Sequence, residues 1–241
     1  MSVTPRSFLG AAALVVAAAC SHSTSTRAPS PIASSAADSA ARVANTGDVP
    51  LASDAAADTL LVDVRSLDTT IIAAMRYATP NNFTGAVIPG YEARRAFLRR
   101  EAAAALARVQ RRALREGLGL EVFDAYRPVR ATEAMVAWTE HTGRQDLIRD
   151  GYIASHSRHN LGVAIDLTLV DRATGRELDM GTQFDTFSAA AHTANAGGDV
   201  ARNRATLLRL MQAEGFVNYD QEWWHFSYPV PDPVRFDMLV R

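Results

Sequence analysis

The first 58 residues of this chain offer almost nothing from which a packed core can be built, so the fold must be formed by the residues after them. Residues 21–58 consist mainly of Ser, Thr, Ala, Pro and Asp, and they include no aromatic residue. Such a segment buries too little apolar surface to offset the entropy lost on ordering, so we expect a disordered tether. Residues 59–241 are numerous enough for one domain around a single core.

Residues 1–20 have the make-up of an export signal. Arg6 precedes an apolar run over residues 8–19 that is too short to span a bilayer as a mature helix. The run ends in small residues directly before Cys20, which resembles the lipidated first residue of a bacterial lipoprotein. The alternative is an ordinary secretory signal cut after small residues, with Cys20 incidental. Both interpretations predict an exported protein of the periplasm or cell envelope, which touches a membrane only through the possible lipid anchor.

Charge and residue usage exclude several kinds of function. The 241 residues carry 25 basic and 26 acidic groups, and a net charge of −1 gives no field for binding nucleic acid. All 25 basic residues are Arg, which excludes chemistry that needs Lys, such as a Schiff base. Because Cys20 is the only cysteine, the chain has no internal disulfide and no Cys-ligated cluster. Any metal must therefore be held by His, Asp or Glu.

The order of the expected elements favours an α+β domain. Strands are predicted at residues 60–64, 118–123, 163–169 and 223–228, and helices at 91–115, from Pro128 onward and around 207–211. Helices come before and between the strands without a regular βαβ alternation. We therefore expect a mostly antiparallel central sheet with flanking helices.

The segment over residues 157–166 carries the first half of a candidate metal site. In the expected strand, the odd-numbered residues from 163 to 169 are apolar and face the core, whereas the other face is small and polar with Asp166 at its centre. Gly162 lets the chain turn, so that His159 folds back beside Asp166. The alternative is a surface strand with a solvated Asp and a loop His, and this segment alone leaves both interpretations open.

The sequence Glu222-Trp-Trp-His225 offers the second half. His225 supplies a third ligand, because two His and one carboxylate, with a position left for water, make a catalytic zinc set. Glu222 is then the candidate base. Positions 222 and 225 differ by three, so a flat strand would put them on opposite faces, and we expect Glu222 in the approach loop or at a bulge. A histidine packed in the core among aromatic residues is the alternative for His225.

Arg127 is a third candidate, in the turn Asp124-Ala-Tyr-Arg-Pro that comes after a predicted strand. An Arg at a strand end, directly before a helix that starts at Pro128, projects from the rim of the sheet, where sites are often built. A salt-bridged surface Arg, one of 25, is the alternative.

These motifs together resemble a known family. The SxHxxGxAxD pattern at 157–166, ExWH at 222–225 and AYRP at 125–128 are similar to those of the VanX-type D-alanyl-D-alanine dipeptidases, which belong to the zinc D-Ala-D-Ala peptidase and hedgehog fold group. RYATPNNFTG at 76–85 and MGTQFD at 180–185 extend the resemblance, which runs in order over nearly all of residues 60–228.

The resemblance implies that fold and one zinc ion per chain, held by His159, Asp166 and His225. It implies that Glu222 is the base that takes a proton from water and returns it to the leaving amine. It also implies that Arg127 stabilises the tetrahedral oxyanion.

The resemblance further places Tyr77, Ser157 and Asp185 around a small dipeptide substrate. Anionic groups such as Asp185 and Glu222 suit its free ammonium end, and Ser157 with nearby backbone N–H groups suits its carboxylate end. The alternatives are a core aromatic for Tyr77, a turn hydroxyl for Ser157 and a helix cap before residues 186–191 for Asp185.

Zinc-dependent hydrolysis of D-Ala-D-Ala in the cell envelope is the function that these observations favour. The first alternative is a peptidoglycan D,D- or L,D-carboxypeptidase or endopeptidase, with the same zinc centre in an open cleft. The second is a noncatalytic binding lipoprotein of the envelope, which predicts loss of the base or of the Arg, yet Glu222 and Arg127 are both present. The oligomeric state does not follow from the sequence.

Overall fold

The computed structural model of the protein describes residues 1–2 and 49–241. From residue 3 onward, the predicted export signal over 1–20, with the proposed lipidation site Cys20, lies outside the described residues, and so does the predicted tether up to residue 48. Within the described part of the chain, no helix is both long and apolar enough to cross a membrane.

The elements are short and irregularly ordered along the chain. The α-helices are α2 (Asp54–Leu60), α3 (Arg100–Arg115), α4 (Val129–Thr142), α5 (Asp146–Arg149) and α6 (Gly198–Gln212). The strands are β1 (Leu61–Asp63), β2 (Ile72–Ala73), β3 (Phe97–Arg99), β4 (Leu118–Asp124), β5 (Ala164–Asp171), β6 (Val217–Asn218) and β7 (His225–Ser227). Short 3₁₀ helices are η1 (Val64–Ser66), η2 (Arg76–Ala78), η3 (Arg158–Leu161) and η4 (Ala189–Ala191).

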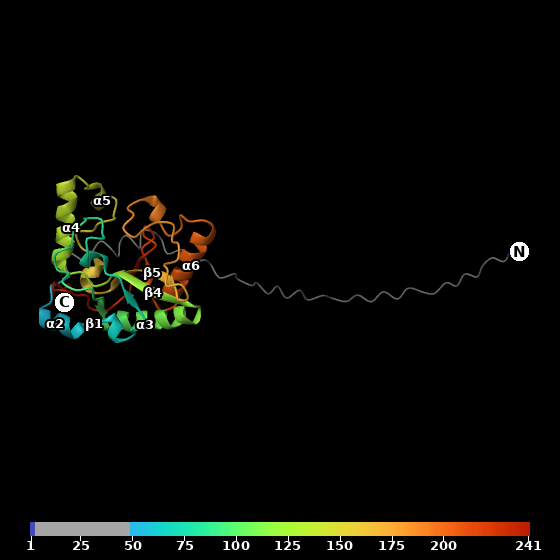
Figure 1. The fold of residues 1–241 in the computed structure, drawn as a ribbon, viewed down its shortest axis with the longest axis horizontal. Coiled ribbons are helices and arrows are strands. Elements are labelled where there is room, and N and C mark those ends of the chain that lie inside the picture. Colours follow the sequence, from blue (N-terminus) through green and yellow to red (C-terminus); the bar gives the residue numbers. More distant parts are fainter. Residues whose placement is uncertain (3–48) are drawn as a thin grey trace, which may run out of the picture. The chain divides into compact units, whose positions relative to one another are not determined.

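A five-stranded sheet has the strand order β2-β4-β5-β7-β6. Its strands β4 and β5 lie in the middle of the domain (Figure 1). β2 runs parallel to β4, and the other neighbouring strands are antiparallel. Helix α3 packs against β4, α6 packs against β5, and the two helices contact each other. β1 and β3 form a separate antiparallel pair. The predicted α+β class with a mostly antiparallel sheet is confirmed.

β5 is the central strand, and it is buried on both faces. Its apolar residues Ile165, Leu167 and Leu169 belong to the core, as the alternation predicts. Its other face is small and polar, as expected, but it is not open to solvent, because Asp166 and Thr168 are buried as well. A buried carboxylate needs partners of opposite charge or hydrogen-bond donors, and the neighbouring strands and loops supply them.

The ordered domain begins earlier than the composition predicts. The prediction of a disordered tether up to residue 58 is wrong for the last part of that segment, because α2 begins at Asp54 and the side chain of Ser53 caps it. Before α2, Ala52 N donates to the carbonyl of Arg235 and Arg235 N donates to that of Pro50, both at 2.8 Å. This segment is ordered by pairing with the far end of the chain, which local composition cannot reveal.

The helix predicted over 91–115 begins only at Arg100. The residues before it form β3, in which Leu98 pairs with Val62 of β1. Leu98 is fully buried, so it joins the same core as the apolar face of α3 while standing in a strand. Helical spacing alone does not separate these two cases.

Candidate active site

Three neighbouring strands carry a row of polar residues across the sheet. Asp124, the last residue of β4, is the register partner of Asp166 in β5, and Asp166 is the partner of His225, the first residue of β7. The register shifts between Val122 and Asp124, and such a bulge re-aims the residue beyond it. Cross-strand partners share a face and stand close together, so the sheet itself gathers these three polar side chains.

His159 reaches the same place from the loop before β5. It lies in η3, and Gly162, the residue after η3, has a φ of 64°, in the left-handed region. The positive φ favours glycine, and a Cβ on Gly162 would lie 2.5 Å from Cδ2 of Leu61, so a larger residue would strain the backbone and displace that side chain. The fold-back of His159 expected from the sequence is present, because its Nε2 lies 3.4 Å from Oδ2 of Asp166.

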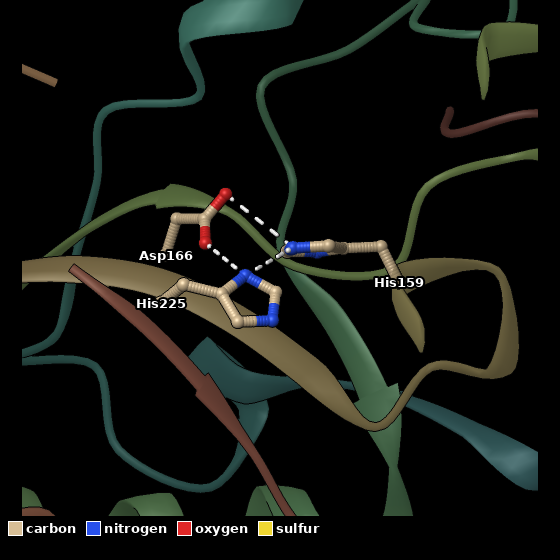
Figure 2. A group of neighbouring side chains, drawn as sticks. All are labelled: His159, Asp166 and His225. Atoms are coloured by element: carbon tan, nitrogen blue, oxygen red, sulfur yellow. Dashed lines mark hydrogen bonds and ion pairs between the residues drawn. The ribbon is translucent and has the colours of Figure 1, made fainter. Parts of the chain in front are cut away.

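The side chains of His159, Asp166 and His225 point toward one another (Figure 2). Nε2 of His159 lies 3.1 Å from Nδ1 of His225, and this Nδ1 lies 2.9 Å from Oδ1 of Asp166. One ligand atom of each residue falls within 4.8 Å of the other two. In the part of the chain that the structure describes, no second group of His, Cys, Asp or Glu side chains converges in this way.

The hydrogen bonds around this cluster suit a cation at its centre. Nδ1 of His159 lies 2.6 Å from the carbonyl oxygen of Ala125, and a carbonyl can only accept, so the proton of the neutral ring is on Nδ1. Nε2 therefore offers a lone pair toward His225 and Asp166. A histidine that is fixed through its other nitrogen, next to a second histidine and a carboxylate, is typical of a zinc ligand set.

Burial and mutual contact set the charges of the cluster. Burial alone raises the pKa of Asp166, but His159 and His225 outweigh this and hold that pKa below its usual range. Burial lowers the pKa of His225, although the neighbouring Asp166 acts against it. An ionised carboxylate beside a neutral imidazole is the protonation state that a metal requires of its ligands.

Glu222 lies in the turn directly before β7. The strand predicted over 223–228 is shorter in the structure, where only β7 forms. Because Glu222 lies in the turn, its three-residue offset from His225 does not force the two side chains onto opposite faces. Oε2 of Glu222 lies 3.9 Å from Nδ1 of His225. Burial, together with the charges of Asp166 and Asp185, raises the pKa of Glu222 well above its usual value. Such a carboxyl group is suited to accept a proton and then return it.

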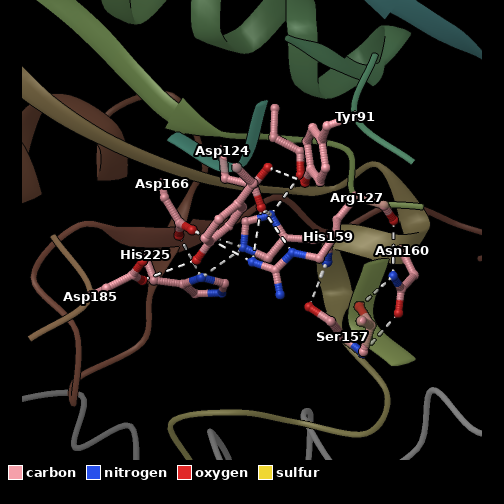
Figure 3. Close-up of polar contacts among 12 residues, drawn as sticks. Tyr91, Asp124, Arg127, Ser157, His159, Asn160, Asp166, Asp185 and His225 are labelled. Atoms are coloured by element: carbon pink, nitrogen blue, oxygen red, sulfur yellow. Dashed lines mark hydrogen bonds and ion pairs between the residues drawn. The ribbon is translucent and has the colours of Figure 1, made fainter. Parts of the chain in front are cut away.

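Arg127 is a buried cation beside the cluster (Figure 3). Its Nη2 lies 2.9 Å from Oδ2 of Asp124 and 4.0 Å from Oδ2 of Asp166, and its side chain is only 11% exposed. Burial lowers the pKa of Arg127, but Asp124 and other neighbours outweigh this and raise it well above the ordinary value. The guanidinium therefore remains charged, and the alternative of a surface Arg does not hold.

Asp185 lines a cavity of about 470 Å³, which Glu222 and Arg127 also line. Oδ1 of Asp185 accepts a hydrogen bond from the hydroxyl of Tyr77 at 3.0 Å. Its Oδ2 is buried and has no hydrogen-bond partner among the described residues. Burial, together with the charge of Asp166, raises the pKa of Asp185 well above its usual value. A cationic group of a bound ligand would relieve both effects.

The three predicted substrate residues, Tyr77, Ser157 and Asp185, all line this cavity. Tyr77 is at the same time a core aromatic residue, and Ser157 Oγ accepts a hydrogen bond from the N–H of His159 as a turn hydroxyl. Asp185 caps no helix, because η4 begins only at Ala189. Contact of these residues with a substrate stays a prediction.

Three residues that the sequence analysis does not name as site residues hold the site residues in place. Asp124 accepts hydrogen bonds from Arg127 Nε at 3.0 Å and from the Tyr91 hydroxyl at 2.6 Å. Nδ2 of Asn160 donates to the carbonyl of Arg127 at 2.9 Å, and its Oδ1 accepts from Ser157 N at 3.1 Å. An acidic residue at the end of an apolar strand was a usable signal for Asp124, but nothing local distinguishes Tyr91 or Asn160.

The remaining described histidines do not join the cluster. His141 is exposed and its Nδ1 lies 2.7 Å from the carbonyl oxygen of Ala137, whereas His192 contacts the hydroxyl of Tyr152. His156 lines the cavity without belonging to the convergent group.

An α+β domain with two histidines, an aspartate, a buried glutamate and a buried arginine around one cavity has the make-up of a metal-dependent peptidase. Residues 57–234 match the family Peptidase_M15, described as D-ala-D-ala dipeptidase. The chain therefore belongs to the Peptidase_M15 family of D-Ala-D-Ala dipeptidases, and it is a peptidase. The resemblance seen in the sequence motifs is confirmed.

Relatives in several bacteria carry the name D-alanyl-D-alanine dipeptidase. The one from Enterococcus faecalis (strain V583) is 37% identical over 175 residues, which cover 65% of this chain and 87% of the relative. The one from Escherichia coli K12 is 37% identical over 173 residues, which cover 71% of this chain and 86% of the relative. The solved structure of a vancomycin-resistance D,D-dipeptidase, VanXYg, with a D-Ala-D-Ala phosphinate analog matches 55% of this chain and 51% of its own, at 20% identity and a TM-score of 0.36.

Proposed function

We propose that this protein hydrolyses the free dipeptide D-Ala-D-Ala, with one zinc ion held by His159, Asp166 and His225. The convergence of these three ligand atoms within 4.8 Å carries the proposal, in a chain whose relatives are named D-alanyl-D-alanine dipeptidases. Zinc in such a set supplies Lewis-acid polarisation of a carbonyl and acidifies water toward a neutral pKa.

Glu222 and Arg127 divide the proton transfer and the charge stabilisation between them. Glu222 takes a proton from the attacking water and returns it to the amine nitrogen as the C–N bond breaks, so that the amine leaves neutral. Arg127 faces the carbonyl oxygen, which becomes negative in the tetrahedral intermediate. Asp124 holds the guanidinium at 2.9 Å, so its orientation is set before the substrate binds.

A dipeptidase must recognise both ends of its substrate, and the cavity offers a group for each. The carboxylate of Asp185, which lines the cavity and has one oxygen without a hydrogen-bond partner among the described residues, suits the ammonium group, and the Tyr77 hydroxyl fixes its other oxygen. Ser157, at the cavity wall beside His159, suits the substrate carboxylate together with nearby backbone N–H groups.

The test of this function compares two substrates with and without a chelator. The full-length protein is expected to cleave free D-Ala-D-Ala, to leave a peptidoglycan pentapeptide ending in D-Ala-D-Ala nearly untouched, and to lose activity when zinc is chelated. Amine release measures all three. Cleavage of the pentapeptide in preference to the dipeptide would point instead to the carboxypeptidase alternative, and inertness toward both would point to the noncatalytic binding protein.

The ligand assignment predicts a loss of metal in three variants. His159→Ala, Asp166→Ala and His225→Ala are each expected to lower the zinc content of the purified protein sharply, because each removes one of three ligands from the set. Elemental analysis by mass spectrometry measures the zinc per chain. His141→Ala is the matched control and is expected to keep a full complement, since His141 is exposed and lies outside the cluster. Undiminished zinc in all three ligand variants contradicts the assignment.

We further propose that the protein is exported and lipid-anchored at Cys20. The support is the order of Arg6, the apolar run over 8–19 and Cys20 in the sequence. Mass spectrometry of the mature N-terminus is expected to find a lipid-modified Cys20. An unmodified N-terminus downstream of Cys20 would leave only the secreted form, and full-length protein in the cytosol would exclude export altogether.

A further inference from the structure

The turn from residue 219 to 225 has to place a base and a metal ligand on the same side of the chain. Glu222 and His225 are three residues apart, and a flat strand would put their side chains on opposite faces. Three backbone hydrogen bonds close the turn: Glu222 N donates to Tyr219 O at 3.0 Å, His225 N donates to Glu222 O at 3.3 Å, and Tyr219 N donates to His225 O at 3.0 Å. The carbonyl oxygens of Glu222 and His225 each accept one of these bonds, so each can still accept a second donor.

The side chain of Asn218 supplies that second donor to the carbonyls of both Glu222 and His225. Asn218 is the last residue of β6, and its Nδ2 donates to Glu222 O at 3.0 Å and to His225 O at 2.8 Å. An amide nitrogen carries two hydrogens, so both are used, one on each residue. One rigid, planar group thus connects the residue that carries the proposed base to the residue that carries the third ligand.

Thr193 fixes the orientation of this amide. Its hydroxyl donates to Oδ1 of Asn218 at 2.6 Å, and its own N–H donates to the carbonyl of Asp220 at 2.8 Å. The amide oxygen and nitrogen of Asn218 are therefore distinguished, because the oxygen accepts while the nitrogen donates twice. Thr193 and Asn218 together hold the turn at three carbonyls, those of Asp220, Glu222 and His225. Asn218 also lines the cavity, but its amide nitrogen is bonded to two of these carbonyls and its oxygen to Thr193.

We propose that Asn218 is a positioning residue of the peptidase, which sets the proposed base Glu222 and the proposed ligand His225 at a fixed separation. The proposal rests on the proposed function of these two residues. A capping asparagine of purely structural use would hold one turn of the backbone, whereas this amide spans the two functional residues, whose side chains lie 3.9 Å apart at Oε2 and Nδ1. Displacement of a reacting group by about 1 Å costs up to ~10²-fold in rate, which sets the size of the expected effect.

The experiment uses the full-length protein and three variants. Asn218→Ala removes both donors and is expected to lower kcat for D-Ala-D-Ala by about 10- to 100-fold with little change in KM, because the residues proposed to bind the substrate are untouched. Its zinc affinity, measured by competition with a chelator, is expected to fall by about 10- to 100-fold, as for other groups that hold a metal ligand in place.

Two further variants separate positioning from general loss of structure. Thr193→Val removes only the hydroxyl that orients the amide, and it is expected to lower kcat by about fivefold, the value of one neutral hydrogen bond. Asn203→Ala is the matched control, because Nδ2 of Asn203 also donates to a backbone carbonyl, that of Asp179, at 2.9 Å but does not contact the turn. It is expected to match the unmodified protein in kcat and in zinc affinity.

A folded Asn218→Ala protein, judged by circular dichroism and thermal unfolding, with kcat and zinc affinity within threefold of the unmodified protein overturns the proposal. An equal loss in Asn203→Ala also overturns it. If Asn218→Ala does not fold, Thr193→Val decides, and full activity in that variant counts against the proposal. Failure of the proposed function is distinct, because the unmodified protein would then leave D-Ala-D-Ala intact while the zinc-affinity comparison still reports on Asn218.

Discussion

The Glu222→Gln protein is expected to fold normally, keep its zinc and lose hydrolysis of D-Ala-D-Ala by at least ~10²–10⁴-fold, the contribution typical of a general base. Glutamine keeps the shape of the side chain but cannot accept a proton from water. Glu222 is buried, and its burial raises its pKa well above the usual value. A proton that it accepts is therefore retained until the leaving amine takes it. Steady-state kinetics and elemental analysis of the same preparation measure the two outcomes.

Glu222→Asp serves as the graded control. It retains the carboxylate but withdraws it by one methylene from its position 3.9 Å from His225 Nδ1, so an intermediate activity is expected. Loss of zinc in the Gln variant would make Glu222 a ligand and require a new metal assignment. Near-full activity of the Gln variant would contradict the proposed role of Glu222 as general base and would favour the noncatalytic interpretation of this cavity.

The fold class was predictable because it depends on patterns that are short in sequence. The alternation of apolar and polar residues over 163–169 predicts a strand with one core face, and the absence of a regular βαβ order predicts a mostly antiparallel sheet. Gly162 indicated the sharp turn that returns His159 to Asp166, and the structure places their side chains 3.4 Å apart. Local rules of this kind carry over to the structure because they do not depend on which distant segments meet.

The contacts that hold the site together were not predictable in the same way. Asp124 gains its place through a bulge in β4, and Asn160 joins two loops that are more than thirty residues apart. Residues 50–52 pair with the backbone of Arg235. Each of these depends on a partner far along the chain, and a polar residue with such a partner has the same local sequence signature as one that is solvated.

The polar face of β5 illustrates the consequence for function. Sequence alternation distinguishes an apolar face from a polar one, but it does not say whether the polar face is open to water. In the structure Asp166 is only 3% exposed, and its ionised state depends on the two histidines beside it. Burial is what converts an ordinary aspartate on a strand into a group that requires a cationic partner.

Arg127→Ala is expected to lower turnover by roughly 10²–10³-fold, about 3–4 kcal/mol of transition-state stabilisation, while zinc content stays unchanged. Arg127→Lys is expected to restore little, because a point charge cannot reproduce a planar fork that contacts Asp124 through both Nε and Nη2. Arg149→Ala is the matched control, since that side chain is 71% exposed and pairs with Asp150 at the surface.

The loss in Arg127→Ala has to be separated from the effect of an orphaned charge. Asp124 has no exposed side-chain surface, and removal of its partner from a buried ion pair typically costs about 3–5 kcal/mol of stability. Asp124→Asn in the same chain removes that charge, so the Arg127→Ala/Asp124→Asn protein is expected to regain thermal stability without regaining turnover. If turnover returns together with stability, or if Arg127→Ala alone loses less than about tenfold, Arg127 acts only through the structure of its loop. If the double variant is stable and inactive, the guanidinium itself meets the developing negative charge.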